Sequence, residues 1–139
     1  MAIKITGVTP LLQVYDMRRS VAFYREMLGF EVVQSYEPEG HLYWAMLRLG
    51  GAVVMLNAKY EDDERPSAAE AASNQDVELY FDCDDVDAAY MLLRRRGCEV
   101  AEPVITHYGM KQMRVRDPDG FGLCFQQPAG EGFDVQSKA

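Results

Sequence analysis

The stretch Asp16-Met17-Arg18-Arg19-Ser20-Val21-Ala22-Phe23-Tyr24 decides how the chain is organised, because a related stretch follows it. Asp85-Val86-Asp87-Ala88-Ala89-Tyr90 starts 69 residues later and also places an Asp between an alternating apolar segment and a helical pattern. Further along, Gly51 and Gly120 open two similar apolar segments, again 69 residues apart. Landmarks at one offset indicate that the chain contains the same structural unit twice.

Each copy is expected to contain a helix with a defined start and end. Asp16 and Asp85 suit the N-cap, because a short carboxylate accepts the free N–H groups of the first turn and faces the positive end of the helix dipole. Gly29 and Gly97 are expected to end the helices in the left-handed conformation. The apolar stripes that should face a sheet are Met17, Val21, Tyr24 and Leu28 in the first helix and Val86, Ala89, Tyr90 and Leu93 in the second.

Alternating and β-branched segments predict one strand before each helix and three after it. This order, β-α-β-β-β in each copy, predicts an α+β fold built from two tandem modules. The expected strands are Pro10–Tyr15, Glu31–Tyr36, Leu42–Leu49 and Ala52–Asn57 in the first copy, and Val77–Cys83, Glu99–Val104, Lys111–Arg116 and Gly122–Gln126 in the second.

The predicted organisation is a single domain over residues 1–139. It comprises a first module at 7–57, a linker or lid at 58–75, a second module at 76–127 and a tail at 128–139. The segment 58–75 is rich in Glu, Asp, Ala and Ser, as solvated connecting segments are.

Composition excludes several classes of protein. With 14 Lys and Arg against 22 Asp and Glu, the net charge of −8 repels a phosphate backbone, so no nucleic-acid partner is expected. No apolar run approaches the ~20 residues of a membrane helix, and the first residues lack a signal-peptide pattern. A cytoplasmic protein without a membrane partner is expected. Cys83, Cys98 and Cys124 form no paired motif and are predicted to be free thiols.

Two such modules, with Phe23-Tyr24 and Leu28-Gly29-Phe30-Glu31 in the first and Asp117-Pro118-Asp119-Gly120 in the second, resemble the vicinal oxygen chelate superfamily. That superfamily includes lactoylglutathione lyases, extradiol dioxygenases, fosfomycin-resistance enzymes and bleomycin-resistance binding proteins. The resemblance covers residues 7–127 and implies that the modules form an open, barrel-like cleft. It also implies a homodimer.

In the enzymes of that superfamily, the first and last strand of each module supply ligands to a divalent metal. The resemblance maps these positions onto Thr9, Met55, Glu78 and Cys124. Only Glu78 is a usual ligand for such a metal, because hydroxyl and thioether groups bind it weakly and a thiol must first lose its proton. We therefore expect no cofactor. The alternative is one Fe, Ni, Zn or Mn ion, bound by Glu78 together with His41 and His107.

Strand alternation predicts which side chains line the cleft. The cleft-facing residues should be Leu11, Gln13, Tyr15, Val53, Met55, Asn57, Glu78, Tyr80, Asp82, Gly122, Cys124 and Gln126. The opposite faces should carry Leu12, Val14, Leu79, Phe81, Leu123 and Phe125.

Trp44, the single tryptophan, matches by position the aromatic residues that stack on planar ligands in the drug-binding members, although a place in the core is an equal alternative. Glu78 is first a candidate ion-pair partner of Arg114 or Arg116, then a counter-charge for a cationic ligand, and last a general base. The expected ligand-binding residues are Gln13, Trp44, Met55, Asn57, Glu78, Tyr80, Tyr108 and Cys124.

The function that these features favour is metal-independent binding or sequestration of a planar small molecule, cationic if Glu78 acts as its counter-charge, as in the bleomycin-resistance branch. No catalytic residue is identified. The alternative is a lyase or dioxygenase with non-standard ligands to a divalent metal, and a purely structural interaction module is a third, weaker hypothesis.

Overall fold

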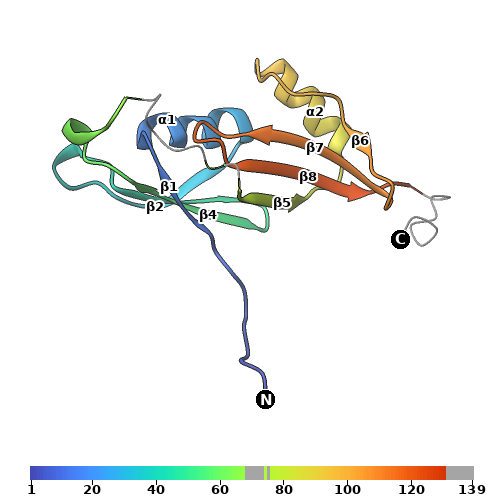
Figure 1. The fold of residues 1–139 in the computed structure, drawn as a ribbon, viewed down its shortest axis with the longest axis horizontal. Helices are drawn as coiled ribbons and strands as arrows, with labels where there is room; N and C mark the ends of the chain where they lie inside the picture. The colour runs from blue at the N-terminus through green and yellow to red at the C-terminus, as the bar shows by residue number, and fades with distance from the viewer. Residues whose placement is uncertain (68–73, 75, 131–139) are drawn as a thin grey trace. The chain divides into compact units, whose positions relative to one another are not determined.

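The computed structural model describes residues 1–67, 74 and 76–130 (Figure 1). The chain forms two compact units, Met1–Ala72 and Ser73–Ala139, each with one four-stranded sheet. The division falls inside the segment predicted to connect the modules. Part of that segment, and most of the tail predicted at 128–139, lies outside the described residues.

In the first unit the strand order is β1-β4-β3-β2, with β1 parallel to β4 and the other neighbours antiparallel. Helix α1 and a π-helical continuation, η1, connect β1 with β2, and two short 3-10 segments, η2 and η3, lie before β3 and after β4. The bounds are β1 Leu11–Val14, α1 Met17–Ala22, η1 Phe23–Leu28, β2 Glu31–Tyr36, η2 Pro38–Gly40, β3 Trp44–Leu49, β4 Ala52–Ala58 and η3 Asp62–Glu64.

The second unit repeats this topology. Its strand order is β5-β8-β7-β6, again with the first and last strands parallel and the others antiparallel. The bounds are β5 Glu78–Asp82, α2 Val86–Arg95, β6 Val104–Ile105, β7 Met110–Arg116 and β8 Gly122–Pro128. The α+β fold and the duplication of the β-α-β-β-β module are thus confirmed.

The helix ends are as the sequence predicts. The Asp16 carboxylate accepts from the backbone N–H of Arg19 at 3.2 Å, and that of Asp85 accepts from Ala88 at 3.0 Å. Gly29 ends η1 with φ at 92°, and Gly97 follows α2 with φ at 84°, values that glycine adopts without strain. The helical segment after Ala22 is π-helical, which apolar spacing did not predict.

One face of each sheet is covered by the module's own helix. In β1, Leu12 and Val14 are buried whereas Leu11 and Gln13 are exposed, which confirms the predicted alternation. The stripe on α1 and η1 is buried, and its Tyr24 side chain is fully enclosed. In the second unit α2 packs against β7 and β8. We call the side of each sheet away from its own helix the open face.

The predicted strand Glu99–Val104 is wrong over most of its length, because only Val104 and Ile105 pair with β7. Pro103 has no N–H to donate to a neighbouring strand, and it restricts the backbone conformation of the residue before it. It therefore limits strand pairing on its N-terminal side. The N–H of Cys98 instead donates to the Leu93 carbonyl at 2.9 Å and closes the end of α2. No helix in the described part of the chain is long and apolar enough to cross a membrane.

Candidate functional site

The open face of the first sheet is apolar and aromatic at its centre. Met46 lies opposite Met55 across β3 and β4, and Leu11 lies on the other side of Met55. Trp44, at the start of β3, pairs with Asn57 and therefore shares this face. Its side chain is half-buried, whereas its neighbour Ala45, which points to the other face beside Leu56, is fully buried. Trp44 therefore belongs to the open face and not to the core.

Next to this apolar surface lies a pair of amides. The Asn57 side-chain Nδ2 donates to the Gln13 Oε1 at 3.1 Å across the parallel β1–β4 pair. The two residues are direct partners in the register, so strand pairing itself brings the amides together. Of the eight predicted ligand-binding residues, four (Gln13, Trp44, Met55 and Asn57) thus share one face of the first sheet.

The open face of the second sheet is polar and centres on Arg114. The Arg114 Nε donates to the Glu78 Oε2 at 3.2 Å, Nη2 donates to the Tyr80 hydroxyl at 3.0 Å, and Nη1 donates to the Gln112 Oε1 at 3.1 Å. Glu78 therefore occupies the ion pair that ranked first in the sequence analysis, with Arg114 and not Arg116 as its partner.

A glycine makes room for this ion pair. Gly122 on β8 lies opposite Glu78 on β5, and a Cβ placed on Gly122 would come within 2.8 Å of the Glu78 Cγ. The side chain of Glu78 therefore lies across the backbone of β8 toward β7. A larger residue at position 122 would displace the carboxylate from Arg114.

Two predicted site residues, Tyr80 and Cys124, are register partners, but only the tyrosine reaches the surface. Cys124 is fully buried, while its β7 neighbour Arg114 is exposed. Burial raises the pKa of the Cys124 thiol; Arg114 lowers it and Glu78 raises it, and the net direction is upward. Burial lowers the pKa of Arg114, whereas its hydrogen bonds to Glu78 and Tyr80 raise it. The net shift of the pKa is upward, so the guanidinium stays charged.

The four positions that the resemblance maps as metal ligands do not fit a divalent metal. Thr9 lies in the exposed segment before β1, Met55 offers a thioether, Glu78 is held by Arg114, and Cys124 is a protonated thiol. Across residues 1–67, 74 and 76–130, no three or more His, Cys, Asp or Glu side chains are grouped in a way that could hold a metal ion.

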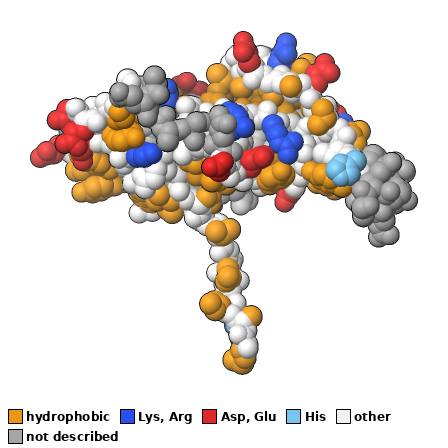
Figure 2. All heavy atoms as spheres, in the orientation of Figure 1, with side chains coloured by type: hydrophobic (Ala, Val, Ile, Leu, Met, Phe, Trp, Pro, Cys, Tyr) orange, Lys and Arg blue, Asp and Glu red, His pale blue; other side chains and the backbone are white. Residues whose placement is uncertain are grey.

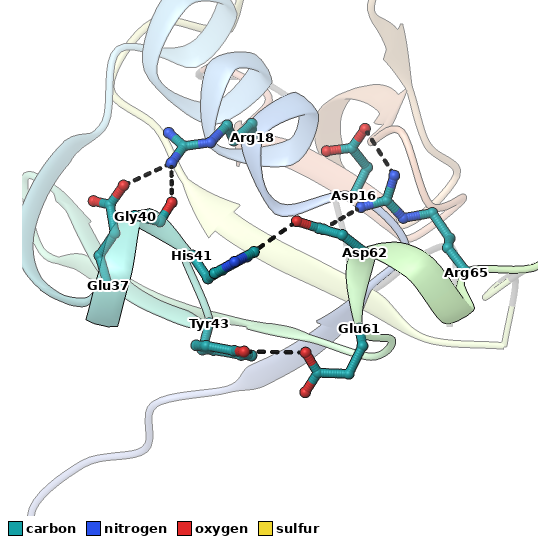
Figure 3. A network of polar contacts seen from close by, with 9 residues as sticks. All are labelled: Asp16, Arg18, Glu37, Gly40, His41, Tyr43, Glu61, Asp62 and Arg65. Atoms are coloured by element: carbon teal, nitrogen blue, oxygen red, sulfur yellow. Dashed lines mark hydrogen bonds and ion pairs between the residues drawn. The ribbon is translucent and has the colours of Figure 1, made fainter.

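The histidines of the alternative metal site have other surroundings. Figure 3 shows His41 in the first unit, where its Nδ1 lies 3.3 Å from the Asp62 Oδ2. Asp62 also accepts from Arg65 at 2.8 Å, and the hydroxyl of Tyr43 donates to Glu61 at 3.0 Å. The contacts of His41 and Tyr43 attach η3, in the segment predicted as a linker or lid, to the loop before β3.

His107 is exposed in the second unit, and its ring meets the edge of the Tyr108 ring, with the two centroids 5.1 Å apart. Tyr108 itself receives a hydrogen bond from the Gln112 Nε2 at 3.1 Å. Sequence reasoning named Arg114 only as a candidate partner of Glu78, and it missed Gln112. The signal was available, because pairing β7 with Cys124 and Gln126 on β8 places both on the same face.

Comparisons with known proteins give a family and a set of similar folds. The family model described as Glyoxalase/Bleomycin resistance protein/Dioxygenase superfamily matches residues 5–125. No curated protein matches the chain. A solved structure, TnmS3, an antibiotic binding protein from Streptomyces sp. CB03234, is 26% identical with a TM-score of 0.69, covering 92% of this chain and 100% of that one.

Two further structures show the same fold at lower identity. A bleomycin resistance determinant encoded on the transposon Tn5 is 21% identical with a TM-score of 0.68, covering 89% of this chain and 98% of that one. A glyoxalase/bleomycin resistance protein/dioxygenase from Nocardioides is 22% identical with a TM-score of 0.71, covering 95% and 89%.

The state of Cys124 can be measured by alkylation. In the native protein, iodoacetamide should modify Cys124 at least about tenfold more slowly than the half-buried Cys83, because burial excludes the reagent and the raised pKa keeps the thiolate fraction low. Mass spectrometry of peptides gives the rate at each position. In urea-unfolded protein all three cysteines should react at similar rates. A Cys124 as reactive as Cys83 in the native state would contradict a buried, protonated thiol.

Proposed function

The chain belongs to the glyoxalase/bleomycin resistance protein/dioxygenase superfamily, and from that premise we propose that it binds a planar small molecule without a metal ion, at the open faces of its sheets. The observation that carries the proposal is the open face of the first sheet, where Trp44, Met46 and Met55 form an apolar surface beside an amide pair. Ligand sites are typically apolar surfaces with a few placed polar groups.

The chemistry of these side chains suits a flat aromatic ligand. An indole ring offers a large rigid surface for stacking, and methionine side chains adapt to irregular shapes and contact aromatic rings favourably. The Gln13 and Asn57 amides keep donor and acceptor capacity beyond their single mutual bond. The description of TnmS3 as an antibiotic binding protein supports the small-molecule part of the proposal.

Binding without turnover is favoured by the state of the candidate reactive groups. The Glu78 carboxylate is occupied by its ion pair with Arg114, and Cys124 is buried and protonated, which makes it a poor nucleophile. The metal-dependent lyase or dioxygenase hypothesis receives no supporting ligand set among the described residues. Sequestration requires only shape, stacking and hydrogen bonding, and the open face of the first sheet offers an apolar surface beside an amide pair.

Methionine variants test the first open face. Met55→Ala should weaken binding of acetylnaphthalene about fivefold to thirtyfold, because a methionine that packs on a ligand contributes about 1–2 kcal/mol. Equilibrium dialysis against the protein gives the affinity. The matched control is Met91→Ala on α2, which removes an exposed methionine away from the sheets and should change the affinity less than twofold. Equal losses in both variants, or none in either, would contradict the proposed site.

We further propose that the protein is a homodimer, held in part by residues 1–9. These residues form an extended arm that leads into β1, and all of them are exposed (Figure 1). Ile3 and Val8 are 87% and 90% exposed, and Figure 2 shows hydrophobic side chains along the arm. Ile3 and Ile5 alternate with Lys4 and Thr6, a pattern that suits a strand with one face buried. A second copy would bury that face.

Light scattering tests the role of the arm. The unmodified protein should have the mass of a dimer, and the double substitution Ile3→Asp with Ile5→Asp should shift it to the monomer, because two carboxylates would be buried at the interface. Thr6→Asp, which adds a charge on the other face of the arm, is the matched control and should remain dimeric. A monomeric unmodified protein, or a double variant that remains dimeric, would refute this contribution of the arm.

A further inference from the structure

The hydrogen bonds on the open face of the second sheet have a fixed direction. An arginine side chain can only donate, so the atoms that face Arg114 must accept. Its Nη2 bond at 3.0 Å therefore ends on the oxygen of Tyr80, and its Nη1 bond at 3.1 Å ends on the Oε1 of Gln112. This assigns which end of the Gln112 amide faces Arg114, and Gln112 is only 2% exposed.

The same order of donor and acceptor continues across the open face of the second sheet. With its Oε1 toward Arg114, Gln112 turns its Nε2 toward the Tyr108 hydroxyl and the Gln126 Oε1, both at 3.1 Å. Gln126 in turn donates from Nε2 to the Asp82 Oδ1 at 3.3 Å. The network thus runs from a group that only donates, Arg114, to an ionised carboxylate that only accepts, Asp82. Both ends agree on one set of amide orientations.

This direction leaves two phenol hydrogens available. The oxygens of Tyr80 and Tyr108 each accept a hydrogen bond from the network, and neither hydroxyl donates to another group within the residues that the structure describes. Tyr80 is 49% exposed and Tyr108 is 39% exposed, so both hydroxyls can reach a ligand. A hydroxyl that accepts from a cationic or amide donor becomes a stronger donor itself, because the two bonds polarise each other.

We propose that Tyr80 and Tyr108 are specificity-determining residues that donate hydrogen bonds to carbonyl oxygens of an uncharged aromatic ligand. This inference rests on the proposed function and names the chemical class of its ligand. On this face the Glu78 carboxylate is already neutralised by Arg114, and the Asp82 carboxylate accepts a hydrogen bond from Gln126. An anionic group meets a guanidinium neutralised by Glu78 in a chain with a net charge of −8. An uncharged carbonyl needs only the donors that are present.

The two copies of the module differ in chemistry at equivalent positions of their open faces. Met46 lies opposite Met55 in the first sheet, and Arg114 lies opposite Cys124 in the second. The β1 neighbour of Met55 is Leu11, whereas the β5 neighbour of Cys124 is Tyr80. The same places in the fold therefore carry apolar side chains in one copy and hydrogen-bonding side chains in the other.

Three probes of similar shape test the inference: acetylnaphthalene with a carbonyl, ethylnaphthalene with no acceptor, and naphthylethylamine with a positive charge. Tyr80→Phe and Tyr108→Phe should each weaken acetylnaphthalene binding about threefold to tenfold, as expected for one hydrogen bond of ordinary net strength. The affinity for ethylnaphthalene should change less than twofold. Tyr90→Phe is the matched control, since Tyr90 also accepts from an arginine, Arg94 at 3.4 Å, but lies on α2.

Infrared spectroscopy supplies a second measurement. The carbonyl stretching frequency of bound acetylnaphthalene should lie below its value in hexane, and the double phenylalanine variant should move it back toward that value. Circular dichroism and the unfolding midpoint in urea show whether each variant is folded. A variant that fails to fold is replaced by Gly122→Ala, which disturbs the Glu78–Arg114 pair and leaves both tyrosines in place.

The outcomes separate the inference from the proposed function. If acetylnaphthalene and ethylnaphthalene bind equally and the tyrosine variants change neither, the inference is overturned while small-molecule binding stands. If naphthylethylamine binds most tightly, a carboxylate of this face, Glu78 or Asp82, acts as a counter-charge and the inference is again overturned. If none of the three probes binds, the proposed binding of planar aromatic molecules fails, and the inference fails with it.

Discussion

Burial of one sheet face beneath one helix is the interaction on which each module depends. Side chains of a strand alternate between its two faces, so covering Leu12 and Val14 with α1 leaves Leu11 and Gln13 on the other side. Tyr24, fully enclosed on η1, anchors the helical segment over the sheet. A slip of one residue in register would expose the apolar set and bury the polar one, so the same contact determines which side chains are available for binding.

The second module has the same strand order, yet its open face has a different chemistry. Parallel pairing of the first and last strands and antiparallel pairing of the rest are retained in both sheets. Because helix packing constrains only the covered face, the open face can change without loss of the fold. One copy carries Trp44 and Met55 there, and the other carries Tyr80 and Arg114. Duplication followed by such divergence explains how two modules with the same strand order carry different side chains on their open faces.

The fold was predictable because its local signals agree with its tertiary contacts. The carboxylates of Asp16 and Asp85 accept hydrogen bonds from the first turns of their helices, as the sequence predicts. The apolar stripe that ends at Leu28 is buried. The prediction of a strand at Glu99–Val104 was wrong over most of its length, because Pro103 has no backbone N–H to donate. An alternating apolar pattern takes no account of a missing hydrogen-bond donor. The π-helical segment was also missed, since a stripe at three- and four-residue spacing fits an α-helix equally well.

The candidate site was predictable in its placement and less so in its chemistry. Alternation put Met55, Asn57 and Tyr80 on open faces, because it depends only on residue parity. The interactions of Glu78 were ambiguous in the sequence, since two arginines were equally available, and the room over Gly122 selects Arg114 in the structure. The donor direction at Gln112 was not predictable, because it follows from the contact of its Oε1 with Arg114, which only the structure shows.

The most direct test of the account is a methyl spectrum of the methionines, recorded while acetylnaphthalene is added. Met46 and Met55 lie on the open face of the first sheet, Met17 is buried in α1, and Met91 is exposed on α2. The account predicts saturable shifts of the Met46 and Met55 methyl signals, with those of Met17 and Met91 unchanged. Shifts confined to Met91 or Met17, or no saturable shift in any methionine, would contradict binding at the open face.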